Sequence, residues 1–130
     1  MKEIKQLSIF AENRPGKVER LAGIMAENKV NILAINITSM GDFGVLKFIV
    51  DKPEAAYRGL KRDGFAVTVN KVLGIEMDDR PGGLFRVSKV LRENGVNVDN
   101  AYVLVPDHRK KALLVIETRE LAKAKKVKGL

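Results

Sequence analysis

The chain has 130 residues, of which 45% are hydrophobic and 31% are charged, and it contains no cysteine. This balance is typical of a globular protein with a buried core, and the length suits one ordinary domain or two very small ones. The lack of cysteine excludes disulfides, thiolate nucleophiles and cysteine metal sites. Charges interrupt the apolar stretches before they reach membrane-spanning length, and the first ten residues do not resemble a signal peptide. A cytoplasmic location without membrane contact is therefore expected.

The net charge of +8 is concentrated towards the end of the chain. From Val105 onward there are eight basic residues against three acidic ones. Such a cluster can attract nucleic acid, but we favour a solvated, partly frayed tail. His108, the one histidine, lies in this basic stretch and is interpreted as a loop residue rather than a metal ligand.

The first half of the chain alternates between β and α patterns. Residues 4–11 predict a strand, and a turn at 12–16 follows it. Pro15 has a fixed φ and no N–H, so it suits the first position of a helix. Beyond it, Val18, Leu21, Ala22 and Met25 recur at helical spacing and predict an amphipathic helix. Further elements are expected as strands at 30–40, 45–50 and 65–69, a turn at 41–44 where Phe43 packs against or shields a pocket, and a helix from Pro53 stopped by Gly64.

The sequence contains an internal repeat. A shift of 66 residues aligns the Asn-Arg-Pro-Gly turn at 13–16 with the Asp-Arg-Pro-Gly turn at 79–82. The match has no gap over about 30 residues and ends with Val30-Asn31 on Val96-Asn97. It indicates two copies of one structural unit. The second copy predicts strands at 71–77, 96–105 and 111–117, a helix at 82–94 and a short helix from about Arg119.

The order β-α-β-β-α-β predicts an α+β fold made of two ferredoxin-like units packed side by side, each an antiparallel sheet with helices on one face. The expected domains are residues 1–70 and residues 71–130, and the second is shortened at its C-terminus. Either residues 125–130 supply a short fourth strand or that edge of the sheet is empty. An empty edge favours pairing with another chain, in a dimer or larger assembly.

The turn before each helix suits an anionic group. The first N–H groups of a helix, here those of about residues 16–18, have no internal partner and lie at the positive end of the helix dipole. They suit a carboxylate or phosphate, and Gly16 lets a ligand approach the backbone. Asn13 and Asn31 are expected at the same end of the sheet, where they would form a polar pocket for a zwitterion. The alternative is that these residues only punctuate the junction between strand and helix.

Both copies resemble a known family. The stretches ENRPGKVERLAGIMAENKVNI and DDRPGGLFRVSKVLRENGVNV are similar to the opening halves of ACT domains, the regulatory ligand-binding modules of amino-acid metabolism. The layout is similar to the stand-alone paired ACT proteins of bacteria and archaea, which have no attached catalytic domain. The resemblance implies a non-catalytic sensor that binds a free amino acid, needs no cofactor, forms a homodimer or higher homo-oligomer, and acts on a partner enzyme or regulator.

The resemblance also implies a set of ligand-binding residues. In the serine-binding ACT domains of phosphoglycerate dehydrogenases, asparagines in the R-P-G turn and at the start of the second strand hold the ligand across an interface between two ACT units. Asn13 and Asn31 match these positions in the first copy, and Asp79 and Asn97 match them in the second. Ala11 and Met77 replace the usual polar residue before the turn, which disfavours serine. The candidate residues are Asn13, Arg14, Pro15, Gly16, Lys17, Val18, Asn31, Ile32, Asp79, Arg80, Gly82, Gly83, Leu84 and Asn97.

Three other functions compete with this one. The net charge of +8 fits an RNA-recognition module, but aromatic residues make up only 5% and the strands lack the stacking side chains that such a module needs. No nucleophile–base pair, phosphate-binding glycine loop or metal cluster indicates an enzyme. A purely structural dimerisation module stays open, and it predicts that Asn13 and Asn31 can be replaced without loss.

Overall fold

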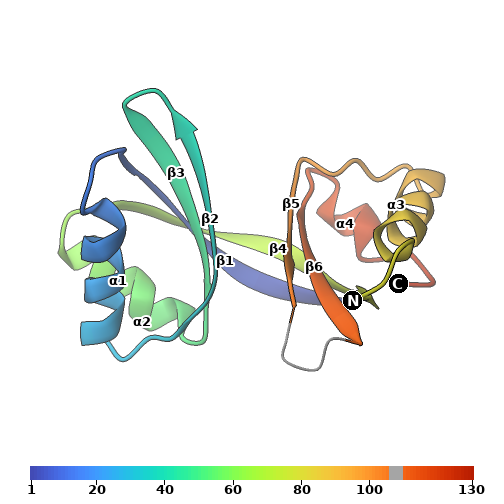
Figure 1. The fold of residues 1–130 in the computed structure, drawn as a ribbon, viewed down its shortest axis with the longest axis horizontal. Coiled ribbons are helices and arrows are strands. Elements are labelled where there is room, and N and C mark those ends of the chain that lie inside the picture. Colours follow the sequence, from blue (N-terminus) through green and yellow to red (C-terminus); the bar gives the residue numbers. More distant parts are fainter. Residues whose placement is uncertain (106–109) are drawn as a thin grey trace. The chain divides into compact units, whose positions relative to one another are not determined.

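The computed structural model describes residues 1–105 and 110–130, so His108 lies outside the described residues. The chain divides into two compact units, one formed by residues 5–70 and the other by residues 1–4 together with 71–130. Within the described residues, no helix has the length and apolar character needed to span a membrane. Figure 1 shows that each unit has helices on one face of its sheet.

The unit of residues 5–70 has the strand order β2-β3-β1-β4, and the pairs of β3 with β1 and β2 are antiparallel. Its core is formed by the alternate residues of the strands that point towards the helices, together with one stripe of each helix. Leu7 and Ile9 on β1, Phe48 on β3 and Leu21 on α1 are fully buried. The elements are β1 (Lys2–Glu12), α1 (Lys17–Glu27), β2 (Ile32–Met40), β3 (Phe43–Val50), α2 (Pro53–Arg62) and the first part of β4 (Ala66–Asp78).

The other unit has the strand order β1-β4-β6-β5 and a separate core. Ile75 on β4, Ile116 on β6 and Val87 on α3 are fully buried in it, and Ala124 on α4 closes one side. This unit therefore repeats the layering of the first, as the internal repeat predicts. Its elements are the second part of β4, α3 (Gly83–Glu93), β5 (Asn100–Leu104), β6 (Lys111–Glu117) and α4 (Leu121–Ala124).

Three of the predicted strands differ clearly from those in the structure. The strands expected at 65–69 and 71–77 form the single strand β4, because the residues between them include neither glycine nor proline to turn the chain. The strand expected at 96–105 begins only at Asn100. The residues before it are held by side chains and by one backbone bond, from the Asp99 N–H to Glu117 O at 2.8 Å. The N–H of Asn97 donates to Glu120 Oε2 at 3.1 Å, and Asp99 Oδ2 accepts the N–H of Arg119 at 2.8 Å.

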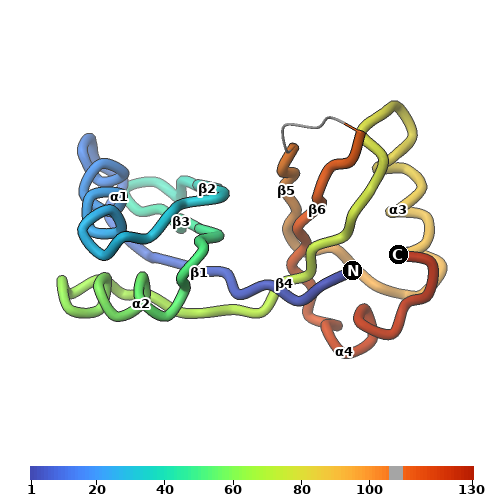
Figure 2. Tube along the Cα trace, turned by 90° about the horizontal axis from the view of Figure 1, so that it is seen from below, coloured from blue at the N-terminus to red at the C-terminus, as the bar shows by residue number. Residues whose placement is uncertain are grey.

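Neither alternative for the incomplete edge of the second unit is correct. Residues 125–130 form no strand, and the first residues of β1 lie beside β4 in the place of a fourth strand (Figure 2). A Cβ added to Gly74 would lie 2.7 Å from Ile4 Cδ1, so the Ile4 side chain covers this glycine. Glu3 pairs with Lys71 Nζ at 3.5 Å and with Lys125 Nζ at 2.6 Å. The edge is therefore filled, and the expectation of a dimer formed through an empty edge is wrong.

Candidate functional site

The first turn enters α1 through a left-handed glycine. Gly16 is the N-cap residue with φ 86°, a conformation that side-chain-bearing residues rarely adopt. The helix begins at Lys17, so Pro15 does not occupy the first helical position as expected. The N–H of Lys17 donates to Arg14 O at 3.2 Å. One of the N–H groups expected to be available for a ligand is therefore already used by the turn itself.

Asn13 is held against the hairpin between β2 and β3. Its Nδ2 donates to Ser39 Oγ at 2.6 Å, and its backbone N–H donates to Asp42 O at 2.8 Å. Beside it, Arg14 Nε lies 2.6 Å from Glu12 Oε2. These bonds fix the direction of the Asn13 side chain while its Oδ1 keeps the capacity to accept further hydrogen bonds.

A hollow of about 320 Å³ lies at this turn and is lined by Glu12, Asn13, Arg14, Asp42 and Phe43. Its size is at the lower end of the range for small-molecule sites. The lining combines two carboxylates with one guanidinium, so it offers partners for both an ammonium and a carboxylate group. Phe43 forms an apolar wall and stacks on Phe10, with 5.3 Å between the ring centroids.

Asn31 does not lie at this end of the sheet. Its N–H donates to Asp51 Oδ1 at 2.8 Å, beyond the far end of β3. The strand register explains the separation. β1 and β2 are both antiparallel to β3, so they run in the same direction, and Asn13 follows the end of β1 whereas Asn31 precedes the start of β2. Ser39 and Asn31 are eight residues apart along this strand, roughly 26 Å at about 3.3 Å per residue. The expectation of one shared pocket in one unit is wrong.

Two of the three remaining candidate residues near the first turn, Lys17 and Ile32, contact other side chains of this unit. The Lys17 ammonium lies 5.5 Å from the centroid of the Phe65 ring, in a cation–π contact. Ile32 packs against the core of residues 5–70, and Val18 is 43% exposed. Of these three side chains, only Val18 is therefore largely open to solvent.

The second turn is built more tightly than the first. Gly82 is again a left-handed N-cap, with φ 91°, but the next residue is Gly83 in place of Lys17. A Cβ on Gly83 would lie 2.1 Å from Asp78 O, so no side chain fits there. Asp79, the counterpart of Asn13, donates its N–H to Lys110 O at 3.2 Å. The following residue Leu84 is 51% exposed.

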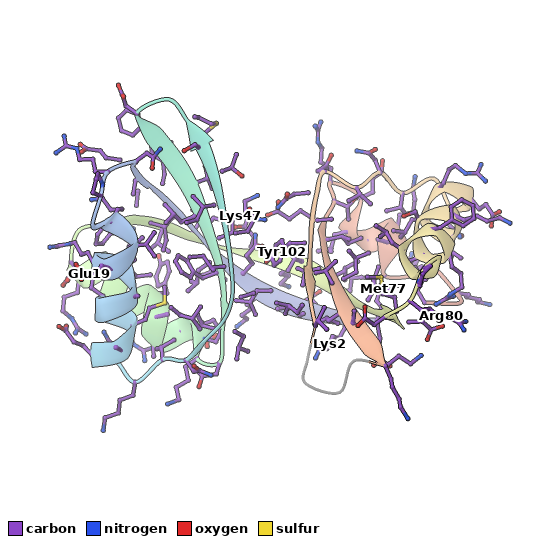
Figure 3. The ribbon with its side chains drawn as sticks, viewed as in Figure 1. Lys2, Glu19, Lys47, Met77, Arg80 and Tyr102 are labelled. Atoms are coloured by element: carbon purple, nitrogen blue, oxygen red, sulfur yellow. The ribbon has the colours of Figure 1, made fainter. Side chains whose placement is uncertain are left out.

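Asp78 is the centre of charge at the second turn. Lys111 Nζ lies 2.6 Å from its Oδ1, and Arg80 lies 3.2 Å from its Oδ2. The hydrogen bond from Lys111, with the charges of Lys111 and Arg80, holds the pKa of Asp78 below its ordinary value. Figure 3 shows Arg80 in the segment between β4 and α3. Asn97 again lies at the opposite end, where its Nδ2 donates to Asp99 Oδ1 at 3.0 Å.

The family model for the ACT domain pair matches residues 2–129. The chain belongs to the ACT domain pair family. The resemblance seen in the two R-P-G turns is therefore confirmed, as is the prediction of an α+β fold with tandem ferredoxin-like units. An ACT domain pair is a regulatory module, which agrees with the predicted class of function.

Solved structures show how widely this ACT pair fold occurs. A protein from Bacteroides thetaiotaomicron is 34% identical, with a TM-score of 0.90 over 96% of this chain and 85% of that one. The regulatory subunit of aspartate kinase from Thermus thermophilus is 14% identical, with a TM-score of 0.69 over 95% of this chain and 92% of that one. Aspartate kinase from Synechocystis is 22% identical, with a TM-score of 0.66 over 94% of this chain but 24% of that one. The two kinase structures share the fold, and no curated protein matches the chain.

Two residues that line the hollow in this ACT pair, Glu12 and Asp42, were missed by the sequence reasoning, as was Ser39, which binds Asn13. Phe43 was expected to pack against or shield a pocket, and it lines the hollow. Only the strand register brings them together, since Glu12 and Met40 are both paired with Phe43. The turn expected at 41–44 was the one available signal, because a hairpin between two neighbours of β1 must end beside a terminus of β1.

Proposed function

We propose that this ACT domain pair is a non-catalytic regulatory protein that binds a free amino acid at the turn of residues 12–16. The observation that carries the proposal is the hollow lined by Glu12, Arg14 and Asp42 beside Asn13, whose side chain is held by Ser39. The carboxylates suit the ammonium group of a zwitterion, and the guanidinium suits its carboxylate. The likeness to a regulatory subunit of aspartate kinase supports a regulatory role. We place the protein in the cytoplasm, where it acts on a partner enzyme or regulator.

A ligand that contacts both Asn13 and Asn31 requires two chains, because one unit holds these residues at opposite ends. The strand β2 is suited to pairing with a second copy. It is an edge strand with no neighbour on its outer side in the described part of the chain. Its side chains Leu33, Ile35 and Ile37 are 52%, 45% and 48% exposed, although Ile35 and Ile37 are paired with the core residues Phe48 and Leu46.

Antiparallel pairing of β2 with its copy would complete the site. A two-fold axis at the middle of β2 sets the start of one strand beside the end of the other. Asn31 of one chain would then lie about one strand spacing, on the order of 5 Å, from Ser39 of the partner chain, whose Oγ accepts a hydrogen bond from Asn13 Nδ2. A ligand at this point contacts Asn31 of one chain and Asn13 of the other. The same axis generates two equal sites, so the homodimer and the ligand site form together.

Thermal unfolding with each of the twenty amino acids tests the proposal. A ligand present at about 100 times its Kd adds roughly 2.7 kcal/mol to the free energy of unfolding, which raises the Tm by several degrees. We expect one class of amino acid to do this, and we expect Asn13→Ala and Asn31→Ala each to abolish the shift. The matched control is Asn97→Ala in the second copy. If no amino acid raises the Tm, the proposal that an amino acid binds at this turn is wrong.

The same variants separate the site from its assembly. Ile37→Asp places a charge on the exposed edge of β2, so it should convert the dimer to a monomer in light scattering and remove ligand binding. If the protein is a dimer but binds no amino acid, and Asn13→Ala and Asn31→Ala leave it unchanged, the chain is a dimerisation module. If an RNA or DNA oligonucleotide binds instead, with an affinity that falls steeply with salt, the basic C-terminal residues are the functional surface.

A further inference from the structure

The two copies of the repeat differ along one stripe of their first helices. The shift of 66 residues aligns Glu19, Gly23 and Ala26 of α1 with Phe85, Lys89 and Arg92 of α3. Both sets recur at i, i+4 and i+7, so each forms one face of its helix. The buried residues Leu21 and Met25 of α1, and their counterparts in α3, lie on the opposite face. The differences in charge and size along this stripe therefore lie in side chains that the core does not constrain.

The outer face of α3 is apolar and basic. Phe85 is 74% exposed, more than any other exposed large hydrophobic residue described in the chain. It lines a hollow of about 370 Å³ with Ser88, Lys89 and Arg92. Glu93 lies 4.0 Å from Lys89 and 3.7 Å from Arg92, so it offsets only part of their charge. Aromatic and arginine side chains are the residues that most often anchor protein interfaces.

The outer face of α1 has the complementary properties. A Cβ added to Gly23 would have no atom within 4 Å, and the nearby Ala22 and Ala26 are small, so this face leaves room for a large side chain. Glu19 and Glu27 stand at the two ends of this face and form no ion pair with any described residue. Figure 3 shows Glu19 on the side of α1 that points away from the sheet.

We propose that the outer face of α3 docks on the outer face of α1 of a second copy of this chain. An antiparallel arrangement of the helices sets Arg92 opposite Glu19 of the partner chain and places Phe85 on the small residues around Ala26. A parallel arrangement would instead bring Phe85 onto Glu19. Size and charge are thus complementary in one orientation only.

This contact joins two different surfaces, so it either continues from copy to copy or is made twice across a two-fold axis, and in both cases it is separate from pairing through β2. It uses no residue of the turn at 12–16 or of β2, so it does not rest on the proposed function. The α1–α3 contact would join ligand-binding dimers, paired through β2, into a larger assembly. The β2 contact and the α1–α3 contact can each be broken by separate substitutions.

Sedimentation of the full chain over a range of concentrations tests the proposal, with charge reversal as the probe. Arg92→Glu and Glu19→Arg should each raise the Kd of the larger assembly roughly 10-fold or more, since like charges then face each other. An equal mixture of the two variants should reassemble with alternating chains, because every α1–α3 contact in the mixture is again between opposite charges. Arg62→Glu, which changes an exposed residue of α2 by the same charge, is the matched control.

Phe85→Glu, which gives α3 the residue that α1 has at this position, should also abolish the larger assembly while circular dichroism stays unchanged. The proposal is overturned if the wild-type chain stays a monomer at every concentration. It is equally overturned if Arg92→Glu and Glu19→Arg assemble as the wild type does, or if their mixture fails to recover what each has lost.

Discussion

The carbonyl oxygen of Asp78 lies against the α-carbon of Gly83, where the second turn enters α3. A Cβ at this position would be 2.1 Å from that oxygen, and the Gly83 N–H donates to Arg80 O at 3.0 Å. The first copy has Lys17 at the matching position. The two turns thus share the R-P-G motif but not the same backbone packing, and only the first has a side chain there.

Gly83→Ala is therefore expected to be strongly destabilising. The atom that the new methyl group meets belongs to the backbone, so the turn or the helix has to shift. We expect the free energy of unfolding to fall by about 2–4 kcal/mol, as overpacking at a constrained position does. Urea denaturation measures the change. A loss below about 0.5 kcal/mol would mean that the turn adjusts freely.

Gly23→Ala should have the opposite effect. Gly23 lies inside α1 with open space around its Cα, and alanine is favoured over glycine in a helix by about 0.5–1 kcal/mol. The gain should appear in the same urea experiment, at protein concentrations too low for assembly. A loss of stability would show that the outer face of α1 is already covered within one chain.

The strand formed by residues 1–4 should control the stability of the unit that it joins. Deletion of residues 2–4 uncovers Gly74 and removes the partner of Lys71 and Lys125. Hydrogen exchange measured by mass spectrometry should then show faster exchange in residues 71–78 and in α4. The amides of β2 and β3 serve as the internal control, and their protection should not change. Equal loss of protection in both units would contradict the assignment.

Glu3 should make this strand sensitive to acid. Its hydrogen bond with Lys125, together with the charges of Lys125 and Lys71, lowers the pKa of Glu3 below its ordinary value. The folded state therefore gains stability from the ionised carboxylate above the ordinary pKa, and this gain is lost as the pH falls through the lowered pKa. Glu3→Gln should be less stable than the wild type at pH 7, and the difference should vanish in acid. Glu76→Gln, also on the surface of this unit, should show no such dependence.

Ser39→Ala should test how Asn13 is positioned. The substitution removes the acceptor that fixes Nδ2 at 2.6 Å but leaves every lining residue of the hollow in place. We expect amino-acid binding to weaken several-fold, less than in Asn13→Ala, with the free energy of unfolding changed by about 1 kcal/mol. Isothermal titration calorimetry measures the affinity for the amino acid. Unchanged binding would mean that Asn13 needs no support from β2.

Local signals predicted much of the fold. Pro53 begins α2 as expected, and α1 and α3 each follow an R-P-G turn, because proline and glycine restrict the backbone by themselves. The repeat predicted two units from one pattern, and both have the expected layering. The exact start of α1 was wrong by two residues, since the left-handed Gly16 rather than Pro15 ends the turn.

The positions of Asn31 and of residues 1–4 could not be predicted in the same way. Asn31 stands at the far end of the sheet because β1 and β2 run in the same direction, which only the pairing of both with β3 reveals. Residues 1–4 read as the start of the first unit, and nothing in their sequence indicates that they pair with β4 beside Gly74. Both features depend on partners distant in the sequence, to which local patterns are insensitive.

The exchange of β1 between the two units has a consequence for synthesis of the chain. Residues 1–4 leave the ribosome before residues 5–130, but Lys125, which binds Glu3 at the end of α4, is made more than a hundred residues later. The unit of residues 5–70 can fold before residues 71–130 are made, whereas the other unit must wait for β6 and α4 and then bring residues 1–4 beside β4. Folding of the unit made of residues 1–4 and 71–130 should therefore be slower than folding of residues 5–70. Its contacts between residues 1–4 and the region of Lys125 join residues more than a hundred positions apart, and such distant contacts form slowly.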